Sequence, residues 1–192
     1  MVPEKMVNGQ KIMNVEKLQH RRAGFTLVEL MIVVAIMGIL AGIAFSLMRN
    51  WLPNMRLRGA TRDVYSVMQR AKAEAIERGA NVAIAYNTVA NTYTMFVDVN
   101  SNRLLDAGEI SLLSSGPMPD GVAFDNRPAP PLPATEVKGA DGIVDGVSFA
   151  GNAVAFTPRG LPVGTGTVAL LATTTGRQRT VTVSIAGRVR MQ

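Results

Sequence analysis

Several residue types that proteins use for covalent and redox chemistry are scarce in this chain of 192 residues. Cysteine is absent, and histidine occurs once, as His20. The absence of cysteine excludes disulfides, thiolate nucleophiles and zinc sites built on sulfur. Because so few side chains could serve as a general base or an activated nucleophile, we do not expect an enzyme. Packing alone must then hold the fold together.

Acidic residues are missing from the last part of the chain. Acids outnumber cations between residues 98 and 145, whereas no acid follows Asp145 and five arginines do. Four of these form two closely spaced pairs, Arg177 with Arg179 and Arg188 with Arg190. The formal net charge of +6 therefore hides an uneven distribution that ends in a cationic strip.

Charge is also nearly absent from residues 25–47, where Glu29 is the single charged residue. At about 1.5 Å per residue a helix of this length reaches roughly 35 Å, enough to cross a hydrocarbon core of about 30 Å. The lysine and arginine surplus in residues 1–24 predicts a cytoplasmic N-terminus and a body on the outer side. A cleaved secretory signal fits less well, because its apolar region is usually about 7 to 15 residues long and rarely holds an acid.

Glu29 needs a compensating charge if it enters lipid. A carboxylate at the bilayer centre costs about 2.5 to 3.5 kcal/mol on insertion scales, so such groups usually have a partner. Cleavage between Gly24 and Phe25 would create an α-ammonium group four residues before Glu29, which is one helical turn. The pair could form within one chain or between neighbouring chains.

The stretch GFTLVELMIVVAIMGILAGIA, which begins at Gly24, resembles the N-terminus of type IV pilins and type II secretion pseudopilins. The resemblance implies that a prepilin peptidase cuts after Gly24 and that Phe25 is then N-methylated. It implies that Glu29 pairs with the N-terminus of an adjacent subunit during assembly. Residues 1–24 are then a cleaved leader, and residues 25–47 a transmembrane and assembly helix. The subunit would wait in the inner membrane before it enters a pilus or pseudopilus.

Residues 48–79 are expected to continue this helix in amphipathic form. Apolar residues recur at helical spacing, and Glu74 can pair with Arg70 and Arg78 at i, i+4. Gly79 is a candidate C-cap, and Pro53 predicts a kink or a brief break. The expected core stripe comprises Leu57, Ala60, Val64, Val67, Ala71 and Ala75.

Residues 80–192 carry the pattern of a β-rich body. A Gly/Pro-rich stretch at about 116–146 is expected to be a surface insertion. A long helix followed by short strands predicts an α+β fold, with the helix packed on an antiparallel sheet or small β-sandwich. The expected strands are Val82–Tyr86, Thr92–Val99, Ile110–Leu113, Val147–Phe149, Ala153–Phe156, Thr167–Ala172 and Thr180–Ile185.

Within the pilin class, this order of elements resembles the GspH/FimT group of minor pilins and pseudopilins. The stretches FTPRGLP at residues 156–162 and GRVR at residues 187–190 are similar to stretches of that group. The resemblance implies a structural subunit of a type II secretion pseudopilus or a type IV pilus. Its partners would be other pilins or pseudopilins, the peptidase, the inner membrane and secreted proteins.

The stretch DVNSNRLLDAGE has the oxygen-bearing residues of an EF-hand calcium loop at positions 1, 3, 5, 9 and 12. Arg103 stands where that loop requires glycine, and the flanks are expected to be strands rather than helices. A polar hairpin loop whose side chains cap turns is the competing and favoured interpretation. The five candidate calcium ligands are Asp98, Asn100, Asn102, Asp106 and Glu109.

The arginines of the tail suggest a second ligand, because guanidinium groups suit phosphate. In DNA-binding minor pilins of the FimT type a GRxR tail is associated with DNA capture, and GRVR is similar to it. No aromatic residue follows Phe156, so binding would be directed at the backbone of double-stranded DNA. A solvated cationic strand edge is the competing interpretation. A single-pass anchored periplasmic protein with no filament role is the remaining alternative.

Overall fold

The computed structural model describes residues 25–127, 137–138, 142 and 144–192. The chain divides between Ile43 and Ala44 into two units. Within the described residues the elements are α1 (Leu27–Arg78), β1 (Val82–Asn87), β2 (Thr92–Val97), β3 (Ser111–Pro117), β4 (Val122–Phe124), η1 (Ala150–Asn152), β5 (Ala153–Phe156), β6 (Pro162–Val163), β7 (Gly166–Ala172), β8 (Gln178–Val183) and β9 (Val189–Met191).

The helix α1 follows the sequence signals closely. It ends at Arg78, and Gly79 follows in the left-handed conformation with a φ of +62°, as expected of a C-cap. Both expected ion pairs form, with Glu74 lying 3.6 Å from Arg70 and 2.7 Å from Arg78. The helix runs through Pro53, so no break occurs there. Proline removes only one hydrogen bond, and the turns on either side keep theirs.

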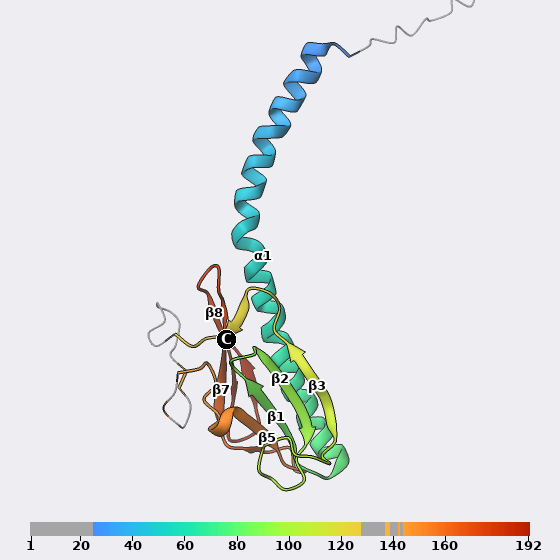
Figure 1. The fold of residues 1–192 in the computed structure, drawn as a ribbon, viewed down its shortest axis with the longest axis vertical. Coiled ribbons are helices and arrows are strands. Elements are labelled where there is room, and N and C mark those ends of the chain that lie inside the picture. The colour runs from blue at the N-terminus through green and yellow to red at the C-terminus, as the bar shows by residue number, and fades with distance from the viewer. Residues whose placement is uncertain (1–24, 128–136, 139–141, 143) are drawn as a thin grey trace, which may run out of the picture. The chain divides into compact units, whose positions relative to one another are not determined.

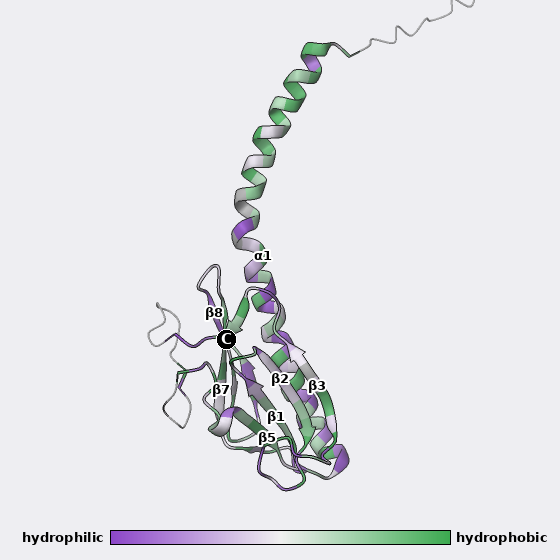
Figure 2. Cartoon of the chain, viewed as in Figure 1, coloured by the Kyte–Doolittle hydropathy of each residue, from purple (hydrophilic) through white to green (hydrophobic). Residues whose placement is uncertain are grey.

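The outer half of α1 buries one face. Figure 2 shows hydrophobic and hydrophilic residues mixed along this part of the helix, as an amphipathic helix requires. The expected stripe is confirmed except at one position, where Met68 is fully buried and Val67 only partly so. The buried apolar residues are Leu57, Ala60, Val64, Met68, Ala71 and Ala75.

The body contains two antiparallel sheets. The five-stranded sheet has the order β3-β2-β1-β5-β6, and the four-stranded sheet has the order β4-β7-β8-β9. Figure 1 shows the second part of α1 running alongside β1, β2 and β3. Buried side chains of both sheets join the buried stripe of α1 in one hydrophobic core. The ring of Tyr86 lies against Phe124 and Phe149, with centroids 5.9 and 6.4 Å away. The predicted α+β fold, with a helix packed on antiparallel sheets, is confirmed.

The strand prediction was wrong at Val147–Phe149 and incomplete elsewhere. Val147 makes only an isolated bridge with Val168. At the next residue a side chain takes part in the pairing, because the hydroxyl of Ser148 accepts a hydrogen bond from the backbone N–H of Thr167 at 2.7 Å. The expected strand Thr92–Val99 was two residues too long, the expected strand Thr180–Ile185 was shifted by two residues from β8, and β4, β6 and β9 were not expected.

The Gly/Pro-rich stretch is not wholly an insertion. Residues 116–127 are ordered parts of the body, since β3 extends to Pro117 and β4 follows. The turn between them closes through a hydrogen bond from the Val122 backbone to the Pro119 carbonyl. The proline run at residues 128–136 lies outside the described residues.

The sheet edges in the described body are short or irregular. The edge strands β6, β4 and β9 have two, three and three residues. The fourth edge strand, β3, has seven residues, and its pairing with β2 shifts register on both sides of Met95. Few regular backbone donors and acceptors are therefore presented to solvent.

Candidate functional site

The start of α1 is built around Thr26 and Glu29. The backbone N–H of Glu29 donates a hydrogen bond to the Thr26 hydroxyl at 3.1 Å. Thr26 is thus the N-cap, and the acid lies in the first turn of the helix. There the positive end of the helix dipole favours a carboxylate, which is a compensation that the sequence analysis did not include. The T-x-x-E spacing of a capping box would have indicated it.

The structure describes one of the two residues at the expected processing site, Phe25. Gly24 lies outside the described residues, as does the whole leader of residues 1–24. Phe25 is exposed and precedes the helix, which begins at Leu27. Phe25 thus lies just outside the helix, because Thr26 takes the non-helical cap position. Pairing between a new amine at Phe25 and Glu29 stays a prediction.

The first part of α1 is a candidate membrane span. Among the described helices, the stretch Leu27–Phe45 is long and apolar enough to cross a bilayer, and none of it is buried within the chain. In the described chain, nothing covers its large apolar side chains, such as Ile32 and Leu40. Lipid or other helices must cover them.

One pair of the C-terminal arginines lines a shared groove in the described part of the chain. Arg188 and Arg190 flank the buried Val189 and line a shallow open groove of about 540 Å³. The other lining residues are Thr182, Ser184, Ala186 and Gln192. Arg177 and Arg179 do not line this groove. Arg179 pairs with the buried Leu170, whereas Arg190 pairs with Thr182, so Arg179 and Arg190 lie on opposite faces of the sheet.

The glycine of GRVR has a packing role. Gly187 has a φ of +72°, and its carbonyl accepts a hydrogen bond from the Lys72 ammonium of α1 at 3.1 Å. A Cβ atom at this position would lie 2.8 Å from the carbonyl oxygen of Gly160. Gly160 belongs to FTPRGLP and itself packs on Ile76 and Lys72 of α1. The two family-like stretches therefore meet on the helix.

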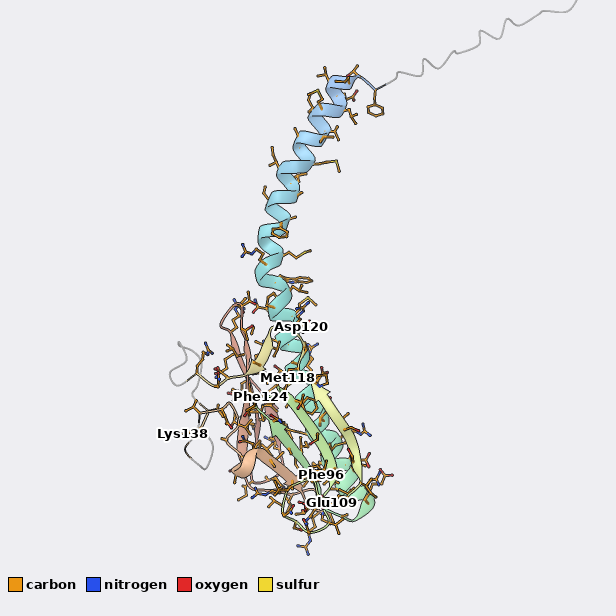
Figure 3. The ribbon with its side chains drawn as sticks, in the orientation of Figure 1. Phe96, Glu109, Met118, Asp120, Phe124 and Lys138 are labelled. Atoms are coloured by element: carbon orange, nitrogen blue, oxygen red, sulfur yellow. The ribbon has the colours of Figure 1, made fainter. Side chains whose placement is uncertain are left out.

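The loop between β2 and β3 is closed by its own side chains. The buried carboxylate of Asp98 accepts hydrogen bonds from the backbones of Asn102 and Arg103, both at 3.1 Å. Glu109 accepts from the backbones of Val99 and Asp106, at 2.9 and 3.1 Å. Figure 3 shows Glu109 at one end of the body, near Phe96. These contacts match the expected turn-capping loop.

The remaining candidate calcium ligands also bond within the loop. The Asp106 carboxylate accepts from the amides of Asn100 and Asn102, both at 2.7 Å, and these hydrogen bonds lower its pKa. Arg103 adopts a φ of +64°, so it occupies the conformation for which an EF-hand uses glycine. Among the described residues, no three His, Asp or Glu side chains form a group that could hold a metal ion. Calcium binding stays a prediction.

A buried ion pair that the sequence analysis missed fixes the chain after β4. Asp125 accepts hydrogen bonds from Arg127 Nε at 2.7 Å and Nη2 at 2.6 Å, and from the Gln178 amide at 2.8 Å. Arg127 also donates to the Gly176 carbonyl at 3.1 Å, in the turn between β7 and β8. Burial would raise the pKa of Asp125, but the hydrogen bonds from Arg127 outweigh it and hold the pKa below its ordinary value.

Two family models match the chain. One, described as type II transport protein GspH, matches residues 60–187, and the other, the prokaryotic N-terminal methylation motif, matches residues 19–45. The pilin-like protein PilA1 of Thermus thermophilus is 31% identical over 182 residues, which is 89% of this chain and 99% of that protein.

Two solved structures are also similar. The minor pseudopilin EpsH of Vibrio cholerae is 12% identical with a TM-score of 0.47, covering 71% of this chain and 96% of that one. The type IV minor pilin FimU of Pseudomonas aeruginosa is 16% identical with a TM-score of 0.47, covering 72% and 90%. From the family models and the relative, the chain belongs to the GspH family and is a membrane-anchored minor pilin or pseudopilin of a type II secretion system or type IV pilus.

Proposed function

We propose that the chain is made as a prepilin, is cut between Gly24 and Phe25 by a prepilin peptidase, and is N-methylated at Phe25. The match to the methylation motif, which includes this bond, supports the proposal. Mass spectrometry of the purified protein tests it directly. A mature chain that begins with methylated Phe25 is expected. An intact leader would instead favour a plain anchored protein.

After cleavage, Glu29 pairs with the N-terminal amine of a neighbouring subunit and sets the axial register of the filament. The observation that carries this proposal is the position of Glu29. It is the only charged side chain of an exposed apolar segment and lies in the first helical turn. A new amine at Phe25 would lie close by along the chain, and a neighbour's amine could approach the exposed carboxylate.

Glu29→Ala and Glu29→Gln are expected to be processed but to enter filaments at least about tenfold less than the wild type, because an unpaired amine remains in an apolar bundle. Sheared filament fractions would be compared with membrane fractions by immunoblot. Glu77→Gln, which alters an exposed acid far along the same helix, is the matched control. Wild-type incorporation of both Glu29 variants would contradict the proposed pairing.

The proposed orientation places the N-terminus in the cytoplasm and the body outside the inner membrane. It rests on the surplus of three positive charges in residues 1–24, where five cations meet two acids. In cells that lack the prepilin peptidase the leader and an N-terminal epitope tag are retained, and protease added to spheroplasts should then digest the body and spare the tag. Protection of the body would reverse the assignment.

We propose protein secretion as the main process that the filament serves, with secreted proteins and other minor pseudopilins as partners. The match to the type II transport protein model supports this choice. Deletion of the gene should then stop export of secreted enzymes and leave DNA uptake intact. Normal export combined with lost uptake would favour a pilus.

DNA binding is the second candidate function, and the groove shared by Arg188 and Arg190 favours it. In this case Arg188→Ala with Arg190→Ala should weaken binding of duplex DNA by the detergent-solubilised chain at least about tenfold at low salt. Arg177→Ala with Arg179→Ala removes equal charge outside the groove and is the matched control. Unchanged affinity in the Arg188 and Arg190 variant would reject this function.

For the loop of residues 98–109 we propose a structural role without a metal. The expected result is that about 1 mM calcium, the range of extracellular sites, leaves the thermal midpoint unchanged relative to a chelator. A rise of the midpoint in the wild type that is lost in Glu109→Gln would assign calcium to the loop instead.

A further inference from the structure

The helix α1 has a second apolar stripe just beyond the candidate span. Met48, Trp51, Leu52 and Met55 recur at i, i+3, i+4 and i+7, which places them on one helix face. All four are exposed, with fractions between 43% and 59%. At about 100° per residue this face lies opposite the buried stripe that begins at Leu57. The body therefore leaves the second stripe uncovered.

Arginines flank this stripe on both sides. On the same helical projection, Arg58 falls on one side of the stripe and Arg49 on the other. Both are exposed, and no hydrogen bond or ion pair holds either within the described chain. Arg56 differs, because it donates to the backbone carbonyl of Asp120 at 3.1 Å. No acid occurs in the sequence between Glu29 and Asp63.

The depth of these residues fits the surface of a bilayer. At about 1.5 Å per residue, Arg49 and Trp51 lie roughly 6 and 9 Å beyond Phe45, and the headgroup zone is about 5 to 8 Å thick. Arg58 lies roughly 20 Å beyond Phe45 along the axis. Helical side chains point back toward the N-terminus, so its guanidinium extends toward the outer side of the headgroup zone.

The body contributes a further cation at this level. The hydroxyl of Thr175, in the turn between β7 and β8, lies 3.2 Å from the side-chain oxygen of Asn54. Arg177, two residues later in the same turn, is exposed. Asp125, an acid close to this turn, is already paired with Arg127. The exposed acid Asp120 also lies at this end, beside Arg56, but the arginines Arg49, Arg56, Arg58 and Arg177 outnumber it.

We propose that Met48, Arg49, Trp51, Leu52, Met55 and Arg58 form an interfacial collar that binds the phosphates of anionic phospholipids in the leaflet next to the body. Tryptophan and arginine beside an apolar stripe are the composition that favours the headgroup zone. A second copy of this chain is a poorer occupant, because its own collar carries the same unpaired arginines and would repel them. Anionic headgroups instead attract basic segments next to a span.

Trp51 is the only tryptophan of the chain, so its fluorescence reports on the collar alone. The full chain would be placed in nanodiscs at one copy per disc, with phosphatidylcholine alone or with about one third phosphatidylglycerol. Quenching by acrylamide, which is uncharged, measures how exposed Trp51 is. We expect the anionic lipid to lower the quenching constant about twofold and to shift the emission to shorter wavelength.

Arg49→Gln with Arg58→Gln should abolish this difference between the two lipids. Arg70→Gln with Arg78→Gln removes the same charge further along the helix and should retain it. Equal quenching of the wild type in both lipids would overturn the proposal, as would loss of the effect in both double variants. Protection that appears only with several copies per disc would assign the stripe to helix packing. Circular dichroism of each variant confirms that the body remains folded.

Discussion

The ion pair between Asp125 and Arg127 should control the stability of the body, and Asp125→Asn is the most direct perturbation. The side chain of Asp125 is 1% exposed, and three side-chain donors converge on it. An asparagine presents an N–H₂ group to at least one donor and carries no charge. The partly buried guanidinium of Arg127 is then left without its counter-ion.

The expected cost follows from these contacts. Hydrogen bonds to charged groups contribute about 1.5 to 3 kcal/mol each, and breaking a buried pair by removing one partner costs about 3 to 5 kcal/mol. Arg127 retains its bond to the Gly176 carbonyl and is 24% exposed, so we expect the lower end, about 3 kcal/mol. For a chain of this size that lowers the thermal midpoint by roughly 6 to 12 °C.

The pH dependence gives a second and independent check. The pKa of Asp125 is lowered in the folded protein, so the pair stabilises the fold above the ordinary aspartate pKa of about 3.9. This contribution is lost as the pH falls through the lower, folded value. The difference in the free energy of unfolding between wild type and Asp125→Asn should therefore be constant between about pH 6 and 8 and should shrink below about pH 4.

Thermal unfolding of the full chain in mild detergent, followed by circular dichroism, measures both effects. Asp120→Asn alters an exposed acid a few residues earlier and should change stability by less than about 0.5 kcal/mol. A cost below about 1 kcal/mol for Asp125→Asn would refute the importance of the pair. A cost that stays the same down to pH 3 would show that its charge is irrelevant.

Three further substitutions test the packing of the body. Tyr86→Phe should raise the free energy of unfolding by about 1 kcal/mol, because the buried hydroxyl has no hydrogen-bond partner in the described chain. Urea titration measures this free energy, and a decrease instead of a rise would reveal a bound water. Asp98→Ala should lower the free energy of unfolding by about 2 kcal/mol, since two backbone N–H groups lose their acceptor. An unchanged free energy in the same titration would show that water replaces the carboxylate. Gly187→Ala should lower the urea midpoint more than Gly164→Ala does. Both glycines have a positive φ, but of the two only Gly187 faces a backbone oxygen, that of Gly160, and equal urea midpoints would refute the clash.

The parts of the fold that depend on local spacing could be predicted from sequence. The buried stripe of α1 follows the helical repeat from Leu57 to Ala75, and Gly79 ends the helix as expected. The one error, Val67 for Met68, is a shift of one residue on a face where both spacings are allowed. Long periodic segments carry enough independent positions to fix a face.

The parts that depend on distant partners could not be predicted. Strands β4, β6 and β9 have too few residues for an alternating pattern, and each is defined by a partner strand. The hydrogen bond between Lys72 and Gly187 joins positions 115 residues apart. Asp125 and Arg127 lie beside a proline run, within the stretch expected to be a surface insertion, and their role depends on the turn at Gly176. The T-x-x-E cap at Thr26 is visible in the sequence, but it lies at the start of an apolar run whose membrane pattern is much stronger.

The short edge strands affect how neighbouring subunits can contact one another in a filament. Subunits stored side by side in a membrane experience each other at high local concentration, which favours strand exchange and fibre growth wherever a long regular edge is open. Edges of two or three residues, and a longer one with a shifting register, give a neighbour little backbone to extend. Recognition between bodies must then be carried by side chains, so a change of surface residues can alter which neighbour is accepted without endangering the solubility of the rest.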